Sequence, residues 1–356
     1  MTEYDEIIAR TATDPDEHLR RMIDWHFDPR TGSRFWLERA AKLDFDPRAE
    51  ITTVADLRRF PDLSDDLRHV PVEDLIPAGA AGEPFDVFDS GGTTGAPKRI
   101  VESVSRAQNA DWVADVLGAH GFPDRGNWLH VGPSGPHVVG RTMRRIAHRR
   151  GGLFFTVDMD PRWVKKLIAA GRGDVARDYV QHLVDQIELV VASQDIRVLF
   201  ITPTVLEAVC ERESLYAQLS ERLGGLLWAG TSASPETLRL IEEELFPNTR
   251  LAGLYGNTLM GIAVQRPKQE DDVHPCVYRP YHPASIVEIV DEESREPVPY
   301  GERGTVLMHL MFRDMFLPNV LERDAAVRIA PGRGDTVDGI ADIGPVASAE
   351  VIEGVY

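Results

Sequence analysis

The chain has 356 residues, a formal net charge of −18 at pH 7 and a hydrophobic content of 43%. This size suffices for a substantial core in one large domain or two ordinary ones, and the negative charge argues against binding nucleic acid through its phosphates. No apolar run is long enough to cross a bilayer, and the first residues lack the basic and apolar segments of a signal peptide. Two cysteines, Cys210 and Cys276, are too few for a disulfide framework, so the composition favours a soluble cytoplasmic protein.

The first 80 residues predict a helical segment, because charged and apolar positions alternate at helical spacing. Its large apolar side chains are expected to pack in the core rather than to contact a ligand. They are Trp25, Phe27, Phe35, Trp36 and Leu37. Residues 52–67 predict two short helices separated at Pro61.

The stretch from Asp89 to Lys98 reads Asp-Ser-Gly-Gly-Thr-Thr-Gly-Ala-Pro-Lys. Its glycines allow the backbone to turn N–H groups inward, its hydroxyl side chains add donors, and Lys98 supplies a positive charge, which together suit nucleotide phosphates. It is not a Walker A loop, because Ala96 and Pro97 precede the lysine and Arg99 follows it. An ordinary glycine-rich surface turn is the alternative.

Strands and helices are expected to alternate after this loop. We expect strands at residues 100–101, 197–203, 226–229 and 251–255. A helix with Trp112, Val113, Val116 and Leu117 on one face is expected after the first strand, and a helix at 205–209 after the second. A further helix is expected after the third strand, capped by Ser234, with Pro235 in its first turn and Pro247 at its end. Such a series makes crossovers with parallel strands. Residues 230–232 and 255–258 then lie side by side at the carboxyl ends of strands, where open α/β sheets bind ligands.

The loop at 89–98 resembles the phosphate-binding signature of adenylate-forming enzymes, the superfamily of acyl-CoA synthetases, peptide-synthetase adenylation domains and luciferase. Gly91 stands in place of that signature's serine, and Arg99 in place of its final glycine. Three further motifs follow in the family's order: Gly230-Thr-Ser232, Leu254-Tyr-Gly-Asn-Thr258 and Glu322-Arg-Asp324. The resemblance covers roughly residues 50–335 and implies an α/β fold, an adenylate-forming N-terminal core with layered αβ subdomains and a smaller distal β subdomain.

The resemblance also assigns roles to individual residues. It implies ATP or AMP as cofactor, with Lys98 at the outer phosphates and Asn257 or Thr258 at the α-phosphate. Lys98 and Thr258 are the implied catalytic residues. Tyr255 would stack on adenine, although a buried tyrosine at a strand end is the alternative. The implied nucleotide contacts are Ser90, Gly92, Thr93, Thr94, Gly95, Lys98, Gly230, Thr231, Ser232, Tyr255, Gly256, Asn257, Thr258, Asp324 and Arg333.

The segment from Trp128 to Gly140 resembles the part of aryl-acid activators that lines the carboxylic-acid pocket. Its aromatic, imidazole and small side chains suit a flat aromatic acid, and the alternative is a glycine-proline loop with a structural histidine. The candidate acid contacts are Trp128, His130, Ser134, His137 and Gly140. A second cluster, His274, Cys276 and His282, has irregular spacing and no fourth ligand, so we predict no metal site there.

Two departures from the family pattern affect the expected chemistry. Leu259 occupies the position of the family's Mg²⁺-binding glutamate, so Mg²⁺ use is in doubt. The family's C-terminal lid domain with its catalytic lysine has no counterpart either, since no lysine follows Lys268 and about 20 residues are too few for a separate core. We therefore expect a helical segment at 1–80, the adenylate-forming core at 81–330 and a hinge-like remnant at 331–356.

The function expected from these resemblances is ATP-dependent activation of an aromatic carboxylic acid to an acyl adenylate. The entry segment around residues 54–68 resembles phenylacetate-CoA ligases, and a core without a lid resembles the phenazine antibiotic biosynthesis proteins, which implies secondary metabolism. A partner protein would then supply the lid function. A non-catalytic nucleotide or aryl-acid binder and an aryl-CoA ligase are the alternatives.

Overall fold

The computed structural model describes residues 1–90 and 95–346. In this part of the chain one mixed sheet of 11 strands has the order β10-β11-β12-β13-β9-β8-β7-β6-β5-β3-β4, and β1 and β2 form a separate antiparallel pair. The strands are β1 (Asp86–Asp89), β2 (Arg99–Glu102), β3 (Asn127–Gly132), β4 (Phe154–Asp158), β5 (Ile196–Ile201), β6 (Gly225–Trp228), β7 (Arg250–Asn257), β8 (Gly261–Gln265), β9 (Tyr278–Arg279), β10 (Ser285–Val290), β11 (Arg303–Met311), β12 (Phe316–Ile329) and β13 (Gly339–Pro345). The mixed architecture confirms the predicted α/β class.

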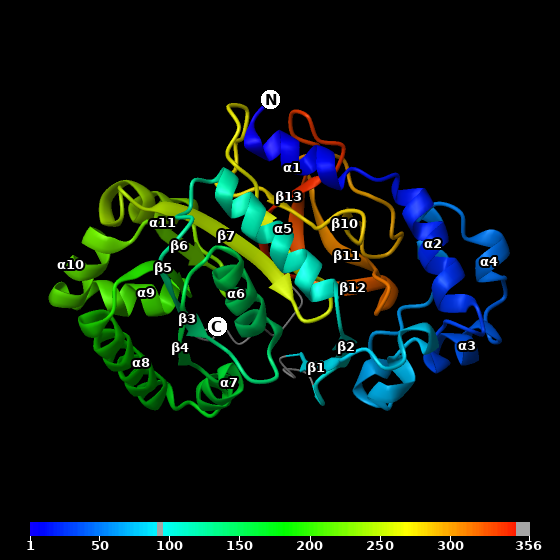
Figure 1. The fold of residues 1–356 in the computed structure, drawn as a ribbon, viewed down its shortest axis with the longest axis horizontal. Helices are drawn as coiled ribbons and strands as arrows, with labels where there is room; N and C mark the ends of the chain where they lie inside the picture. The colour runs from blue at the N-terminus through cyan, green and yellow to red at the C-terminus, as the bar shows by residue number, and fades with distance from the viewer. Residues whose placement is uncertain (91–94, 347–356) are drawn as a thin grey trace.

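The helices surround this sheet (Figure 1). The α-helices are α1 (Glu3–Thr11), α2 (Pro15–Phe27), α3 (Arg34–Ala40), α4 (Pro47–Glu50), α5 (Ser105–Ala119), α6 (Val138–Arg149), α7 (Pro161–Ala169), α8 (Gly173–Ser193), α9 (Pro203–Cys210), α10 (Glu213–Arg222) and α11 (Pro235–Leu240). Shorter turns are η1 (Val54–Arg59), η2 (Asp66–Arg68), η3 (Val72–Leu75), η4 (Ala78–Ala80) and the π-helical η5 (Ile241–Leu245). Among the helices described, none combines the length and apolar content that crossing a membrane requires.

The half of the sheet formed by β4, β3, β5, β6 and β7 is parallel and lies between two helical layers. Alternate side chains of strand β5 face the two layers. Val198 and Phe200 pack with α1, α5 and α6, whereas Leu199 and Ile201 pack with α7, α8, α9 and α10. This confirms the predicted strands and helices in the middle of the chain. The carboxyl ends of β6 and β7 consequently lie together at one edge.

Local capping signals fix the helices that follow these strands. Thr202 accepts from the Val205 backbone N–H at the start of α9, and Ser234 accepts from the Thr237 N–H at the start of α11. Pro235 occupies the first turn of α11, as predicted. The helix continues only to Leu240 and passes into the π-turn η5 before Pro247.

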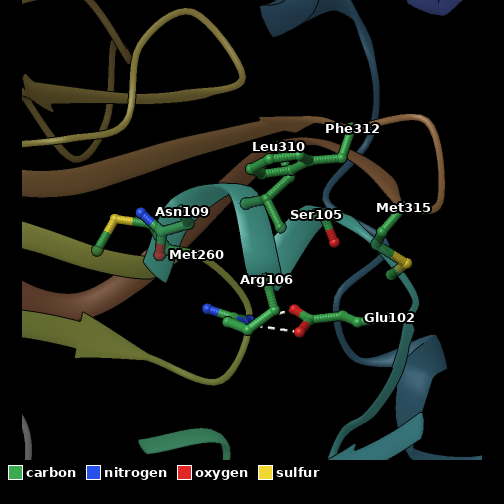
Figure 2. A pocket seen from close by; sticks show the side chains of 8 residues that line it. All are labelled: Glu102, Ser105, Arg106, Asn109, Met260, Leu310, Phe312 and Met315. Atoms are coloured by element: carbon green, nitrogen blue, oxygen red, sulfur yellow. Dashed lines mark hydrogen bonds and ion pairs between the residues drawn. The ribbon is translucent and has the colours of Figure 1, made fainter. Parts of the chain in front are cut away.

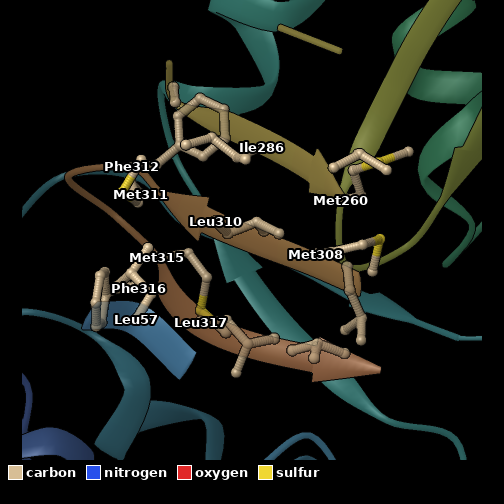
Figure 3. Close-up of a cluster of buried hydrophobic side chains, with 14 of the residues drawn as sticks. Leu57, Met260, Ile286, Met308, Leu310, Met311, Phe312, Met315, Phe316 and Leu317 are labelled. Carbon is tan, nitrogen blue, oxygen red and sulfur yellow. The ribbon is translucent and has the colours of Figure 1, made fainter. Parts of the chain in front are cut away.

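The N-terminal segment packs against the antiparallel half of the sheet, formed by β8 to β13. Figure 3 shows part of this shared core, where Leu57 faces the methionines and leucines of β11 and β12. The Trp36 indole N–H donates to the Phe316 carbonyl at 2.9 Å, and Phe60 packs edge-on against Phe316. The two short helices expected on either side of Pro61 are the 3₁₀ helices η1 and η2.

Residues 331–345 form the loop after β12 and the strand β13. The loop after β12 is fixed by a buried ion pair in which Arg279 Nη2 donates to Asp335 Oδ1 at 3.1 Å. Strand β13 then enters the sheet between β12 and β9. The described part of the segment therefore belongs to the core.

Candidate functional site

Segments far apart in sequence meet at the carboxyl edge of β7. They are the ends of the 89–98 loop, the turn after β7, and the middle of β12. In Figure 1 the β7 arrow ends beside the lower end of α5, above the β1–β2 pair. Three of the four predicted motifs therefore lie near one another.

The two ends of the 89–98 loop are paired. The Ser90 N–H donates to the Lys98 carbonyl at 2.9 Å, and the Lys98 N–H donates to Ser90 Oγ at 2.8 Å. Gly95 has a φ of +140°, which side-chain-bearing residues rarely adopt. Gly92, Thr93 and Thr94 lie outside the described residues. The two described ends of the loop are thus joined at Ser90 and Lys98.

The turn after β7 contacts this loop directly. Thr258 Oγ1 donates to the Asp89 carbonyl at 3.2 Å, and Asn257 Oδ1 accepts from the Met260 N–H at 2.8 Å. Gly256 allows the β7–β8 hairpin to close, because an added Cβ would collide with the Gly261 carbonyl oxygen. The structure therefore brings Thr258 to the start of the loop, as the motif order suggested.

Residues Gly230, Thr231 and Ser232 follow β6, the parallel neighbour of β7. Gly230 has a φ of +89°, so the chain turns sharply at the end of the strand. Within the described residues, Thr231 Oγ1 is buried and has no hydrogen-bond partner. A buried hydroxyl without a partner can serve a ligand.

Tyr255 and Asp324 form the connection between β7 and β12. The Tyr255 hydroxyl donates to Asp324 Oδ2 at 2.9 Å. Burial, and next the Asp324 charge, raise the pKa of Tyr255 well above 10, so the hydroxyl keeps its proton. Burial also raises the pKa of Asp324, while the Tyr255 hydrogen bond opposes this shift.

Glu322 lies two residues before Asp324 on β12, where the pairing of β12 with β11 is irregular. Burial, and next the Asp324 charge, raise the pKa of Glu322 to about 7, whereas Lys98 lowers it. The Lys98 charge is therefore near enough to Glu322 to affect that carboxyl group. The carboxyl groups can accept hydrogen bonds from hydroxyl groups of a ligand, and Lys98 can donate to phosphate oxygens.

Arg333 lies elsewhere. Its backbone N–H donates to Gln269 Oε1 at 3.0 Å, and the following Gly334 approaches Asp5 of α1. This loop joins β12 to β13 at the end of β12 that follows Ile329 and adjoins α1. The structure does not bring Arg333 to Tyr255 and Asp324.

The segment from Trp128 to Gly140 is split between core and surface. Trp128 is buried among α5 and α6, and His130 is buried between the rings of Phe154 and Phe200. Burial lowers the pKa of His130 to about 4, so this histidine is neutral. Neither side chain offers a surface to a ligand in this structure.

Ser134, His137 and Gly140 lie nearer to the site. Ser134 Oγ donates to Asp158 at 2.7 Å, and Gly140 allows α6 to start against the backbone of Ser134. The Pro136 carbonyl accepts from the Asp89 N–H at 3.0 Å, which places His137 beside the start of the phosphate loop. Burial lowers the pKa of His137, and in the described structure its buried Nε2 has no hydrogen-bond partner.

Sequence analysis missed a buried ion pair beneath Thr258. Glu102 accepts from Arg106 Nε at 2.6 Å, and Arg106 also donates to the Thr258 carbonyl at 3.2 Å. Figure 2 shows this pair beside a cavity of about 10 Å³, the size of one water, walled by Met260, Leu310, Phe312 and Met315. In the sequence, this ion pair is visible only as two opposite charges four residues apart, Glu102 and Arg106. Because this spacing is common on exposed helix surfaces, it does not indicate that the pair is buried.

Leu259 does not fit a metal ion. Its side chain is buried in the same apolar core as the N-terminal helices, and leucine has no ligand atom. In the part of the chain that the structure covers, no group of three His, Cys, Asp or Glu side chains could hold a metal ion. His274 pairs with Asp342, Cys276 bonds to Gln265, and burial lowers the pKa of His282 to about 4.

Residues 174–310 match the family model described as AMP-binding enzyme. No curated protein matches the chain. The match covers β5, β6 and β7 with the motifs at 230–232 and 255–258, so this part of the chain is similar to AMP-binding enzymes.

Solved structures show the fold. The open conformation of 2-hydroxyisobutyryl-CoA ligase, in complex with 2-HIB-AMP and CoA, superposes with a TM-score of 0.66 and 16% identity over 94% of this chain and 69% of that chain. The thioesterification state of the same ligase gives a TM-score of 0.65, 17% identity and coverage of 94% and 68%. ATP-bound MatB from Rhodopseudomonas palustris superposes with a TM-score of 0.50 and 15% identity, over 76% of this chain and 49% of that chain.

The chain therefore has the fold of the N-terminal core of adenylate-forming enzymes. It spans about two thirds of the length of the 2-hydroxyisobutyryl-CoA ligase.

Proposed function

We propose that this chain uses ATP to activate a carboxylic acid. A carboxylate oxygen would attack the α-phosphorus and form the acyl adenylate, while the bond from that phosphorus to pyrophosphate breaks. The observation that carries the proposal is the convergence of Tyr255, Asp324, Thr258 and Lys98 at one edge of the sheet. Positioning and charge neutralisation supply most of the catalysis in such a reaction.

Each of these residues has a role that its contacts support. Asp324 has one carboxylate oxygen bonded to Tyr255, which leaves the other for the ribose hydroxyls. The Tyr255 ring offers an apolar face to adenine. Thr258 lies against the start of the phosphate loop and suits the α-phosphate, and Lys98 at the end of that loop suits the outer phosphates. Gly230, Thr231 and Ser232, on the adjacent strand end, would border the adenine.

The acid would bind beside His137. The solved ligases contain an acyl adenylate, 2-HIB-AMP, in their complexes, which supports an acyl-AMP product here. A half-buried imidazole with a partnerless buried nitrogen suits a planar acid with a polar substituent. We infer an aromatic acid, and a role in phenazine-like antibiotic biosynthesis in the cytoplasm, from the resemblances in sequence.

Two alternatives have support of their own. The burial of Leu259 favours a binder of nucleotide or aryl acid without catalysis, because the family's metal ligand is replaced by a core residue. The CoA present in the solved ligase complexes favours an aryl-CoA ligase. No step is assigned to Mg²⁺, because residue 259 cannot hold it.

Thermal unfolding with ATP, AMP and benzoate-like acids, followed by ATP–pyrophosphate exchange, tests the proposal. A ligand that binds the native state raises the melting temperature. Stabilisation by ATP and by the acid, with exchange that depends on both, supports an adenylating enzyme. Stabilisation without exchange, even with candidate partner proteins added, supports the binder, and no stabilisation by any nucleotide contradicts both.

A further inference from the structure

The Lys98 side chain is held by a segment far from it in sequence. Lys98 Nζ donates to Ser64 Oγ at 2.7 Å and lies 3.5 Å from Asp65 Oδ1. Ser64 is buried, with 3% of its surface exposed, whereas the Asp65 side chain is 81% exposed. The buried hydroxyl is therefore the contact that fixes the ammonium group, because an exposed ion pair contributes little.

Ser64 is itself fixed to the strand that carries Asp324. Asp62 Oδ1 accepts from the Ser64 N–H at 2.9 Å, and Asp62 Oδ2 accepts from the Leu321 N–H at 3.0 Å. One carboxylate thus joins the turn that holds Lys98 to β12. Lys98 and Asp324 are consequently held relative to each other through Asp62 and Ser64.

The same segment contacts the phosphate loop at a second point. The Arg68 guanidinium donates to the Ala96 carbonyl and to Asp65 Oδ1, the latter at 3.2 Å. Residues 62–68, which we call the 62–68 segment, therefore touch the loop at Ala96 and at Lys98. These residues are contributed by the N-terminal segment of the chain, in which the sequence indicated no residue of the site.

The chemistry of the Ser64 contact suits a lysine that must bind phosphate. An ammonium group has three donors, so a single hydroxyl acceptor leaves donors for phosphate oxygens. A hydroxyl also leaves the positive charge in place, which a buried carboxylate would neutralise. Holding the side chain beforehand removes part of the rotamer entropy that binding would otherwise cost.

We propose that Ser64 is a positioning residue, which holds Lys98 for the outer phosphates of ATP and acts on the nucleotide only through that lysine. The proposal rests on the proposed function, because it requires a nucleotide at this site. It predicts a difference between nucleotides, since AMP has no outer phosphates. A purely structural serine would affect both nucleotides alike.

The test compares Ser64→Ala with the unmodified chain by calorimetric titration of ATP and of AMP. We expect ATP binding to weaken about three- to tenfold, as for the loss of one hydrogen bond, and AMP binding to change less than about twofold. In the Lys98→Ala background, Ser64→Ala should have no further effect on ATP. Asp66→Asn is the matched control, because Asp66 lies in the same segment but bonds to Arg39 at 2.6 Å.

The outcomes separate this inference from the proposed function. Equal losses for ATP and AMP, no loss for either, or full additivity with Lys98→Ala would overturn the positioning role while the proposed function stands. No binding of either nucleotide to the unmodified chain would overturn the proposed function and this inference with it. Should Ser64→Ala not fold, Ser64→Cys keeps the size, replaces the hydroxyl by a weak acceptor and answers the same question.

Discussion

The Tyr255 hydroxyl donates a 2.9 Å hydrogen bond to the Asp324 carboxylate, although β8, β9 and β13 lie between their strands in the sheet. Neighbouring strands are about 4.8 Å apart, so a flat sheet would keep these side chains far beyond contact. The sheet must therefore curl at this edge. The curl brings Tyr255 on β7 and Asp324 on β12 together.

The first prediction concerns this pair. Asp324→Ala should weaken binding of ATP and AMP by about 1.5–3 kcal/mol, because hydrogen bonds to a charged group are lost, and Tyr255→Phe by about 0.5–1.5 kcal/mol. Calorimetry measures both. Tyr300→Phe is the matched control, since Tyr300 donates to Asp338 at 3.0 Å outside the site. Unchanged nucleotide affinity in Asp324→Ala would remove Asp324 from the site.

Lys98 should distinguish between nucleotides. Lys98→Ala is expected to weaken ATP binding by about 1.5–3 kcal/mol and AMP binding far less, because the charge would act on the outer phosphates. The exposed Lys42→Ala is the control. Equal losses for ATP and AMP would count against this role for Lys98.

Glu322 should make stability depend on pH. Its pKa is raised from 4.5 to about 7 in the folded chain, so the folded state binds the proton more tightly than the unfolded state does. The free energy of unfolding should therefore fall as pH rises from about 4.5 to about 7. Glu322→Gln should be more stable than the unmodified chain at pH 8, by about 1–2 kcal/mol after allowance for partial exposure, and similar at pH 4.5.

Urea unfolding at the two pH values measures this effect. The exposed Glu302→Gln serves as the control and should follow the unmodified chain. The groups that face Glu322 are Asp324, Lys98, Arg323 and Asp62, and all of them remain in the variant. A constant difference between Glu322→Gln and the unmodified chain at both pH values would refute the raised pKa.

Leu259 should be needed for stability. Because its side chain is buried in the core, Leu259→Glu should lower the free energy of unfolding by about 2–4 kcal/mol, while Leu259→Met should cost less than about 1.5 kcal/mol. Denaturant unfolding measures both variants. If Leu259→Glu is instead as stable as Leu259→Met and gains Mg²⁺-dependent exchange, residue 259 lies at the site and not in the core.

His137 should set the preference for the acid. His137→Phe keeps a flat side chain and removes the polar nitrogen, so affinity for hydroxylated or heteroaromatic acids should fall about three- to tenfold while that for benzoate changes little. Thermal shift or calorimetry with a set of acids checks this. His130→Phe is an informative comparison, because His130 is buried and should affect stability rather than ligand preference. Tighter binding of long-chain fatty acids would contradict the aromatic acid.

Local sequence determined the elements that carry the site. The apolar run of β5 ends before Pro203, and Ser234 with Pro235 starts α11, because strand patterns and helix caps depend on neighbours within a few residues. The loop at 89–98 and the turn at 255–258 were likewise evident from their glycines and hydroxyl groups. These motifs were sufficient to predict the α/β class and the edge of the sheet where they meet.

Only the tertiary structure decided which of the chemically capable residues reach that edge. His130 and His137 are seven residues apart and similar in sequence context, yet β3 buries the first, while the loop before α6 brings the second to the phosphate loop. Arg333 is carried to the far end of β12, and Ser64 reaches Lys98 from 34 residues away. Such pairings arise from how the N-terminal segment and the strands pack on one another, and no pattern confined to neighbouring residues encodes them.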